Sequence, residues 1–310
     1  MLTSRDLDTG EYMAIAADET ERPPEFSSLV RVELAAQTHP GKVRGNNEDH
    51  YYTARFGRAL VTLSTNVPDE LVPARYEETA YAMVVADGIG GRAAGEVASS
   101  LAISTGLNLA LHCPKWNLVP TPEEIQENME KWRQRFRQID YVLSERAASD
   151  PALHGMGTTL TLACSIGADL VLYYVGDSRA YLFRQARLIR LTRDHTMAQL
   201  LADAGVIAPE EIATHRQRHT LTRSLGRGGG DVEVELDHIH LAHGDRLLLC
   251  TDGLTDMVPD AKIAQILSGL ASSHAACQAL IAAALEAGGK DNVTVVLGRY
   301  SIPELAQGSQ

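Results

Sequence analysis

The sequence predicts an α+β protein in which antiparallel sheets are covered by helices. Strand-like apolar runs dominate the second half of the chain, and short Gly-Asp, Ala-Asp or Arg-Gln turns separate several of them. Short connections of this kind join antiparallel neighbours. Helical patterns precede, interrupt and follow the strands without a regular β-α-β alternation, which argues against a doubly wound sheet.

The first half of the chain is predicted to hold three strands and two long helices. The expected strands are Val30–Thr38, Ala59–Ser64 and Tyr81–Ala86, and the expected helices are Ala94–Leu111 and Glu123–Ala148. The second helix carries an apolar stripe, typical of a face that packs on a core; it comprises Ile125, Met129, Trp132, Phe136, Ile139 and Leu143. The segment Thr65–Thr79 is polar and contains two prolines, so we expect a loop insertion there.

The second half of the chain is predicted to be rich in strands. Those expected are Thr158–Ile166, Leu170–Val175, Ala180–Arg184, Arg187–Leu191, Val232–Leu241, Arg246–Cys250 and Asn292–Arg299. Three helices are expected among and after them, at His195–Ala204, Asp260–Ser268 and Ser272–Ala287. Strands that alternate with so few helices favour sheets with helical covers.

The composition excludes several classes of protein. A chain of 310 residues with 45% apolar composition can bury a sizeable core. The net charge of −12 argues against a general nucleic-acid binder, because phosphate backbones attract clustered Lys and Arg. No uninterrupted apolar run of about 18 residues occurs, so we expect a cytoplasmic protein with no membrane partner. The four cysteines lack metal-binding spacing and are expected to be reduced and structural.

Four short acidic patches indicate a metal site. The apolar run Tyr81–Ala86 leads directly into Asp87, and the run Arg246–Thr251 leads directly into Asp252. Each carboxylate is therefore expected where a buried strand ends, and clustered carboxylates bind hard cations such as Mg²⁺ or Mn²⁺. The other two patches are Arg44-Gly-Asn-Asn-Glu-Asp49 and Lys290-Asp-Asn292. Singly each patch could be a solvated turn, and Asp177, between two strands, could be either a turn residue or a ligand.

The order of these patches is more specific than any one of them. It resembles the metal-dependent protein serine/threonine phosphatases of type 2C, in their bacterial branch. The resemblance is carried by Arg44–Asp49, Asp87–Gly91, Gly157–Thr159, Gly176–Arg179, Leu191–His195, Leu221–Gly226, Thr251–Gly253 and Asp291–Asn292. It implies a phosphatase domain over residues 30–300, folded as a four-layer α-β-β-α sandwich of two mainly antiparallel sheets. Residues 1–29 are then an acidic, disordered or loosely ordered tail, and 301–310 a C-terminal tail.

The resemblance also implies roles for particular residues. Asp87 would bridge two Mn²⁺ or Mg²⁺ ions, with the Gly88 carbonyl and Glu48 completing one of them. Asp252 and Asp291 would hold the other. A water between the ions would attack phosphorus in phosphoserine or phosphothreonine.

Three further roles follow from the same resemblance. Asp49 would orient the attacking water, and Asp177 with Asp252 would bind a third, weaker ion. Arg44 would bind the phosphoryl oxygens, which suits a guanidinium because it can contact two oxygens at once. The implied partner is a phosphoprotein, namely a Ser/Thr protein kinase or its targets.

The chain departs from the animal-type pattern at Ile89, where that pattern has a histidine proposed as the general acid. Ile89 cannot donate a proton, and the bacterial branch commonly lacks the histidine too. His195 is interpreted as a residue that opens the following helix, and Leu200–Thr222 as the segment beside the metals that decides substrate selectivity. Two alternatives stay open: an inactive interaction module on the same fold, and a calcium-stabilised β protein, which would leave Arg44 unexplained.

Overall fold

The computed structural model describes residues 26–90, 94–112, 122–227 and 232–303. Residues 1–25 of the expected tail 1–29 and residues 304–310 of the expected C-terminal tail lie outside this range, whereas residues 26–29 of the first are helical and Ser301 of the second still belongs to a strand. Phe26–Leu29 form a short helix, α1. Its Ser27 hydroxyl accepts a hydrogen bond from the backbone N–H of Thr79, which ties the start of the described chain to a neighbouring strand.

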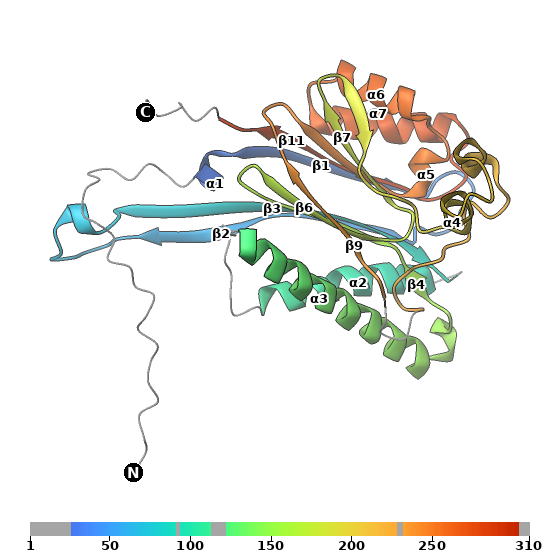
Figure 1. Ribbon diagram of the computed structural model, residues 1–310, viewed down its shortest axis with the longest axis horizontal. Coiled ribbons are helices and arrows are strands. Elements are labelled where there is room, and N and C mark those ends of the chain that lie inside the picture. Colours follow the sequence, from blue (N-terminus) through green and yellow to red (C-terminus); the bar gives the residue numbers. More distant parts are fainter. Residues whose placement is uncertain (1–25, 91–93, 113–121, 228–231, 304–310) are drawn as a thin grey trace, which may run out of the picture.

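Two antiparallel sheets form the centre of the molecule (Figure 1). The first contains, in spatial order, β1 (Arg31–His39), β11 (Val293–Ser301), β10 (Arg246–Cys250), β7 (Arg179–Arg184) and β8 (Arg187–Arg190). The second contains β2 (Asp49–Val61), β3 (Arg75–Ile89), β5 (Leu160–Ile166), β6 (Asp169–Val175) and β9 (Glu235–His240), with β4 (Gly157–Thr158) paired to the end of β3.

Helices cover the outer faces of both sheets (Figure 1). The second sheet is covered by α2 (Ala94–Leu111) and α3 (Pro122–Ser149), and the first by α6 (Asp260–Gly269) and α7 (Ser273–Glu286). The remaining elements are α4 (Met197–Asp203), α5 (Asp252–Thr255) and the 3₁₀ turns η1 (Asp69–Leu71), η2 (Pro151–Leu153) and η3 (Pro209–Thr214). The predicted α+β fold, with two antiparallel sheets between helical layers, is confirmed.

Three apolar layers hold these elements together, and β10 shows why a strand between two of them is apolar after its opening residue, Arg246. Leu247 and Leu249 belong to the core between the sheets, whereas Leu248 and Cys250 belong to the core beneath α6 and α7. Side chains alternate across a strand, so a strand buried on both faces needs no polar position. The third layer lies between the second sheet and its helices, where the expected stripe of α3 buries Phe136, Ile139 and Leu143. The side chains of Ile125 and Met129 lie outside the described set.

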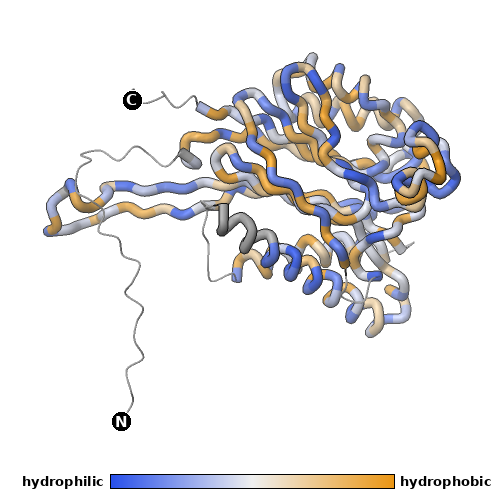
Figure 2. Tube along the Cα trace, in the orientation of Figure 1, coloured by the Kyte–Doolittle hydropathy of each residue, from blue (hydrophilic) through white to orange (hydrophobic). Residues whose placement is uncertain are grey.

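The β2–β3 hairpin is longer than the sequence predicts, and it projects from the body of the molecule (Figure 1). The expected loop was Thr65–Thr79, but β3 begins at Arg75, and β2 begins at Asp49, ten residues before the expected strand. β2 is an edge strand whose residues are mostly half-buried or exposed, so it needs no apolar run, which is why the pattern misses its first ten residues. Figure 2 shows hydrophilic and hydrophobic residues mixed along this hairpin.

Among the helices in the described part of the chain, none combines the length and the apolarity that a membrane span requires.

Candidate metal centre

The ends of strands from both sheets bring the predicted carboxylates together. Asp49 opens β2 and lies directly opposite Asp87 near the end of β3. Asp252 opens α5 immediately after β10, and Asp291 lies two residues before β11. The negative charges of Asp49, Asp252, Asp177 and Asp291 all raise the pKa of Asp87, after the larger effect of its burial. The five carboxylates therefore occupy one site.

The backbone of Asp87 is fixed by two threonines. The Thr159 hydroxyl accepts a hydrogen bond from the Asp87 N–H at 3.0 Å, and the Thr158 hydroxyl donates to the Asp87 carbonyl at 2.8 Å. The N–H of Thr159 donates to the same carbonyl at 2.9 Å. These bonds place Asp87 at the junction of β3 and β4, so its carboxylate is held in position before any ligand binds.

Asp49 has one satisfied and one unsatisfied carboxylate oxygen. Its side chain is 4% exposed, and its Oδ2 accepts hydrogen bonds from the hydroxyls of Thr251 and Thr294, both at 2.8 Å. Its Oδ1 is buried and has no hydrogen-bond partner among the described residues. Burial raises the pKa of Asp49 to about 7 against the lowering effect of the two hydroxyls. A buried acceptor without a donor is costly, and a cation or a water held by one would remove that cost.

A chain of side chains orders one of the two hydroxyls on Asp49, that of Thr294. The Thr294 hydroxyl has one proton, which it donates to Asp49, so the Thr38 hydroxyl 2.7 Å away donates to Thr294. Thr38 in turn accepts from the side-chain amide of Asn47 at 2.8 Å. The sequence analysis did not single out these threonines. Thr251 precedes Asp252, and Thr294 lies two residues after Asn292, but hydroxyls near strand ends are too common to be a signal.

Asn292 organises the loop that carries Glu48. Its side-chain oxygen accepts from the Glu48 N–H at 2.8 Å, while its amide nitrogen donates to the carbonyls of Pro40 and Asn46. The Glu48 carbonyl accepts from the Ser99 hydroxyl at 2.6 Å. Burial raises the pKa of the Glu48 carboxyl, which is the direction expected of an uncompensated carboxylate.

Helix α2 approaches this loop closely because it carries a glycine there. A Cβ at Gly95 would lie 2.2 Å from Oε2 of Glu48, and one at Gly88 would lie 2.1 Å from the Gly95 carbonyl oxygen. Any side chain at either position would displace the helix or the carboxylate. Gly88 is thus needed for its small size, in addition to the role of metal ligand that the sequence analysis expected for its carbonyl.

Arg44 lies at the exposed edge of the cluster. Its Nη2 is 2.7 Å from Oδ2 of Asp291, and its side chain is 59% exposed. That hydrogen bond is the main reason why the pKa of Arg44 is raised, and the charges of Glu48 and Asp87 act in the same direction. The guanidinium is therefore next to the candidate metal ligands and open to solvent, as a group that binds an incoming anion must be.

The sequence left open whether Asp177 is a turn residue or a metal ligand, and its position in the structure suits both roles. It lies in the turn between β6 and β7, and it is 8% exposed. Burial and then the charge of Asp252 raise its pKa well above the ordinary value. The residue is both part of a turn and close to a second carboxylate.

His219 is a residue at this site that the sequence analysis did not single out. It belongs to the segment between α4 and β9. Its Nδ1 lies 3.6 Å from Oδ2 of Asp252, and its Nε2 lies 3.2 Å from Oδ2 of Asp256. These three side chains have the composition and spacing of a group that could hold a cation. Contact with Asp252 raises the pKa of His219. The segment expected beside the metals is therefore in contact with a candidate ligand.

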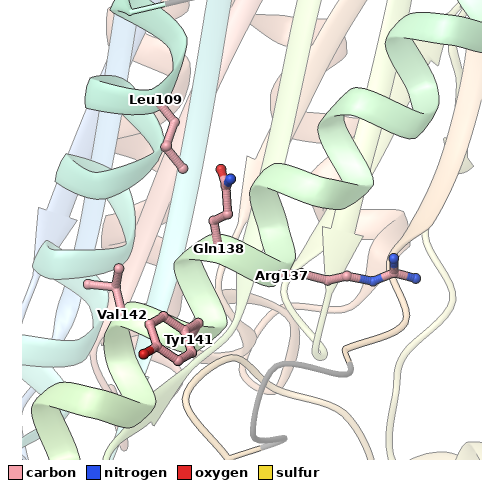
Figure 3. Close-up of a pocket in the computed structure, with 5 residues that line it drawn as sticks. All are labelled: Leu109, Arg137, Gln138, Tyr141 and Val142. Atoms are coloured by element: carbon pink, nitrogen blue, oxygen red, sulfur yellow. The ribbon is translucent and has the colours of Figure 1, made fainter.

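A shallow pocket elsewhere does not belong to this site (Figure 3). Its lining comes from the outer helices α2 and α3 and comprises Leu109, Arg137, Gln138, Tyr141 and Val142. It contains none of the clustered carboxylates, so it offers no chemistry for a phosphate ester.

The donor set fits hard divalent cations. Oxygen atoms of Glu48, Asp87, Asp252 and Asp291 dominate, and hard oxygens suit Mg²⁺ and Mn²⁺. The buried Oδ1 of Asp49, unpaired among the described residues, independently indicates that a positive group belongs here.

Residues 64–287 match the sequence profile of protein phosphatase 2C. The chain belongs to this family. It is 37% identical to the serine/threonine protein phosphatase PstP of Mycobacterium tuberculosis over 85% of the chain, but it spans only 44% of that relative. It is 31% identical to the protein phosphatase PhpP of Streptococcus pneumoniae over 86% of the chain and 96% of PhpP.

Solved structures of family members share the fold. The catalytic domain of PstP in complex with two manganese ions superposes with a TM-score of 0.68 at 34% identity, covering 88% of this chain and 99% of that one. The phosphatase Stp1 of Staphylococcus aureus gives a TM-score of 0.69 at 31% identity, covering 87% and 95%. The two stacked sheets with outer helices are therefore the family fold.

Proposed function

We propose that the protein is a metal-dependent phosphatase that hydrolyses phosphoserine and phosphothreonine monoesters in proteins. The observation that supports this most strongly is the convergence of five aspartates from both sheets, with a buried, unpaired oxygen on Asp49 and an exposed guanidinium at the edge. The names of the family members, serine/threonine protein phosphatases, support the substrate class.

In this proposal the carboxylates hold Mn²⁺ or Mg²⁺. Asp87 would be shared by two ions, Asp252 and Asp291 would contribute to one, and Glu48 with the Gly88 carbonyl would contribute to the other. Asp177 and Asp252 would hold a third, weaker ion. When bound, such a pair supplies a water of lowered pKa and neutralises the charge of the phosphate ester.

The protein's own groups bind the substrate and orient the water. Arg44 binds two phosphoryl oxygens, and its contact with Asp291 keeps it at the cluster. Asp49 accepts a hydrogen bond from the attacking water through Oδ1, while Thr251 and Thr294 hold Oδ2. Ile89 offers no proton for the leaving oxygen, so a water held in the site would have to supply it.

The partner class follows from the substrate class. A phosphatase of this kind acts on phosphoproteins, and we propose that these are a Ser/Thr protein kinase or its targets in bacterial signalling. The exposed position of Arg44 supports a protein substrate, because an exposed guanidinium can reach a phosphorylated side chain that is still attached to a chain.

The test compares two chemically identical substitutions. Asp87→Asn should abolish hydrolysis of p-nitrophenyl phosphate and of a phosphothreonine peptide in Mn²⁺, because the shared carboxylate is lost. Asp169→Asn, at the opposite end of β6 from the Gly176 turn, should keep the wild-type rate. Equal rates in wild type and Asp87→Asn would contradict the proposal, and a folded wild type without turnover would favour the inactive interaction module.

A further inference from the structure

His195 makes two hydrogen bonds to one residue of the Asp177 turn. Its ring Nδ1 accepts from the backbone N–H of Gly176 at 3.1 Å, and its own N–H donates to the Gly176 carbonyl at 2.9 Å. The side chain is 7% exposed and stacks on Tyr174, with ring centroids 5.5 Å apart. The helix that follows is capped by Thr196, so His195 does not open it, contrary to the sequence interpretation.

The turn held by His195 also contacts Thr159, which holds the backbone of Asp87. Gly176 has a φ of +104°, and a Cβ there would lie 2.5 Å from Cγ2 of Thr159. The Thr159 hydroxyl is the group that accepts from the Asp87 N–H. The turn therefore fits between His195 on one side and Thr159 on the other, and a shift of Gly176 would move Asp177 directly.

His195 also joins this turn to the segment that carries His219. Its carbonyl accepts from the N–H of Thr222 at 2.8 Å, and the N–H of Met197 donates to the Thr220 carbonyl at 2.8 Å. One residue thus connects the Gly176–Asp177 turn with the C-terminal end of the segment beside the metals.

The imidazole is neutral in this environment. Burial and the nearby Arg223 lower the pKa of His195 to about 4. A neutral ring that accepts at Nδ1 carries its proton on Nε2. That Nε2 is buried without a hydrogen-bond partner among the described residues, and Oε1 of Glu235 lies 4.0 Å away. The ring therefore accepts the Gly176 N–H through Nδ1, while its Nε2 has no hydrogen-bond partner among the described residues.

We infer that His195 is a positioning residue whose Nδ1 fixes the Gly176–Asp177 turn and thereby sets the carboxylate of Asp177 for a divalent cation. The inference rests on the proposed function only for the presence of that cation. His195 touches neither substrate nor reacting atoms, so its effect should pass through Asp177.

Two substitutions of similar size separate the acceptor from the packing. In His195→Asn, the side-chain oxygen stands close to the place of Nδ1 and can still accept from Gly176. In His195→Leu, no acceptor remains. We expect calorimetric titration with Mn²⁺ to show the weakest binding step of His195→Leu reduced by about 10-fold, as for losses of groups that orient metal ligands. His195→Asn should bind nearly as the wild type does.

A double mutant tests the route through Asp177. If His195 acts through that carboxylate, His195→Leu should change Mn²⁺ binding little in an Asp177→Asn background, because coupled residues are not additive. Should His195→Leu not fold, His195→Gln replaces it, since its oxygen stands nearer to the place of Nε2 and cannot serve Gly176.

Several outcomes would overturn the inference. They are an equal loss of binding in the Asn and Leu variants, a lowered melting temperature with an unchanged Mn²⁺ isotherm, and full additivity with Asp177→Asn. Binding is measured without turnover, so an inactive wild type with the expected isotherms would contradict the proposed function and leave the inference standing. A wild type that binds no Mn²⁺ would contradict both.

Discussion

Two groups of buried or half-buried aspartates differ in their partners. Asp194 is paired with Arg179 and Arg190, and Asp245 with Arg184. Asp49, Asp87 and Asp177 have no ion pair of this kind in the described part of the chain, and burial raises the pKa of each. Buried charges are ordinarily paired or bound to metals. The second group is therefore the part of the molecule whose chemistry suits bound cations.

At Asp49, removal of one hydroxyl should slow catalysis without unfolding the protein. Thr294→Val keeps the shape of the side chain but removes one of two donors to Oδ2. A hydrogen bond to a charged group contributes about 1.5–3 kcal/mol, so kcat/KM for p-nitrophenyl phosphate should fall about 10-fold or more in saturating Mn²⁺. Thr294→Ser should restore most of the rate. A valine variant with wild-type kcat/KM would show that the Thr294 hydroxyl does not contribute to catalysis.

At Arg44, the expected loss is in substrate binding. Arg44→Ala should raise KM for a phosphopeptide and lower kcat/KM by about 10- to 100-fold, the range for a charge-assisted contact. Arg75→Ala is the matched control, because Arg75 forms an exposed ion pair with Glu77 on the projecting hairpin. If both variants kept the wild-type KM, Arg44 would not contact the phosphoryl group.

At Asp177, the ligand role predicts an effect that a turn residue would not show. Asparagine serves the same turn but lacks the charge, so Asp177→Asn should keep its melting temperature in saturating Mn²⁺. Its kcat should fall, and more Mn²⁺ should be needed for half-maximal rate. A wild-type kcat with a wild-type metal curve would leave Asp177 as a turn residue only.

Among the elements, α2 is the one whose position depends most closely on the site. Gly95 lies in its first turn, where a Cβ would meet the Glu48 carboxylate at 2.2 Å. Alanine usually stabilises a helix relative to glycine by about 0.5–1 kcal/mol. Here Gly95→Ala should instead lower the melting temperature and raise the Mn²⁺ concentration needed for half-maximal rate.

Gly269, in α6, provides the control for that prediction. A Cβ there has no atom within 4 Å, so Gly269→Ala should leave the metal requirement unchanged. A stabilised Gly95→Ala with a normal metal requirement would show that the close approach of α2 to Glu48 is dispensable.

The elements also show where sequence patterns stop being informative. Strands covered on both faces, such as β10 after its opening Arg246, are apolar and were predicted within one or two residues. The first ten residues of β2 and the short helix α5 were not, because a half-exposed ribbon and a single turn leave no apolar period. Asp87 and Asp252 were predicted by their place at strand ends, and the other candidate ligands by the family resemblance. Thr38, Thr294 and His219 are brought to the site only by tertiary structure.

For the whole molecule, the clustered carboxylates predict an unusual pH dependence of stability without metal. The folded-state pKa of Asp49, about 7, is above its unfolded value, and those of Asp87 and Asp177 are raised as well. In this range the folded state binds more protons than the unfolded state, so stability falls as pH rises. The melting temperature in EDTA should therefore decrease from pH 5.5 to pH 8.

Metal should reverse that trend, since cations replace the protons. Mn²⁺ should raise the melting temperature more at pH 8 than at pH 5.5, and Asp49→Asn should flatten the curve measured in EDTA. Calorimetry at the two pH values provides the measurement. A melting temperature in EDTA that is constant or rises over this pH range would show that the negative charges of these carboxylates are neutralised in some other way.

The measurement that tests the central claim most directly is reconstitution with Mn²⁺. Protein freed of metal with EDTA is returned to metal-free buffer, and phosphate release from a phosphothreonine peptide is followed while Mn²⁺ is added and its binding is measured in the same sample. We predict no turnover before addition and a rate that rises in step with filling of the tight sites, because the attacking water depends on ions held by Asp87. Full turnover in metal-free buffer, or a rate that does not change as those sites fill, would contradict the account.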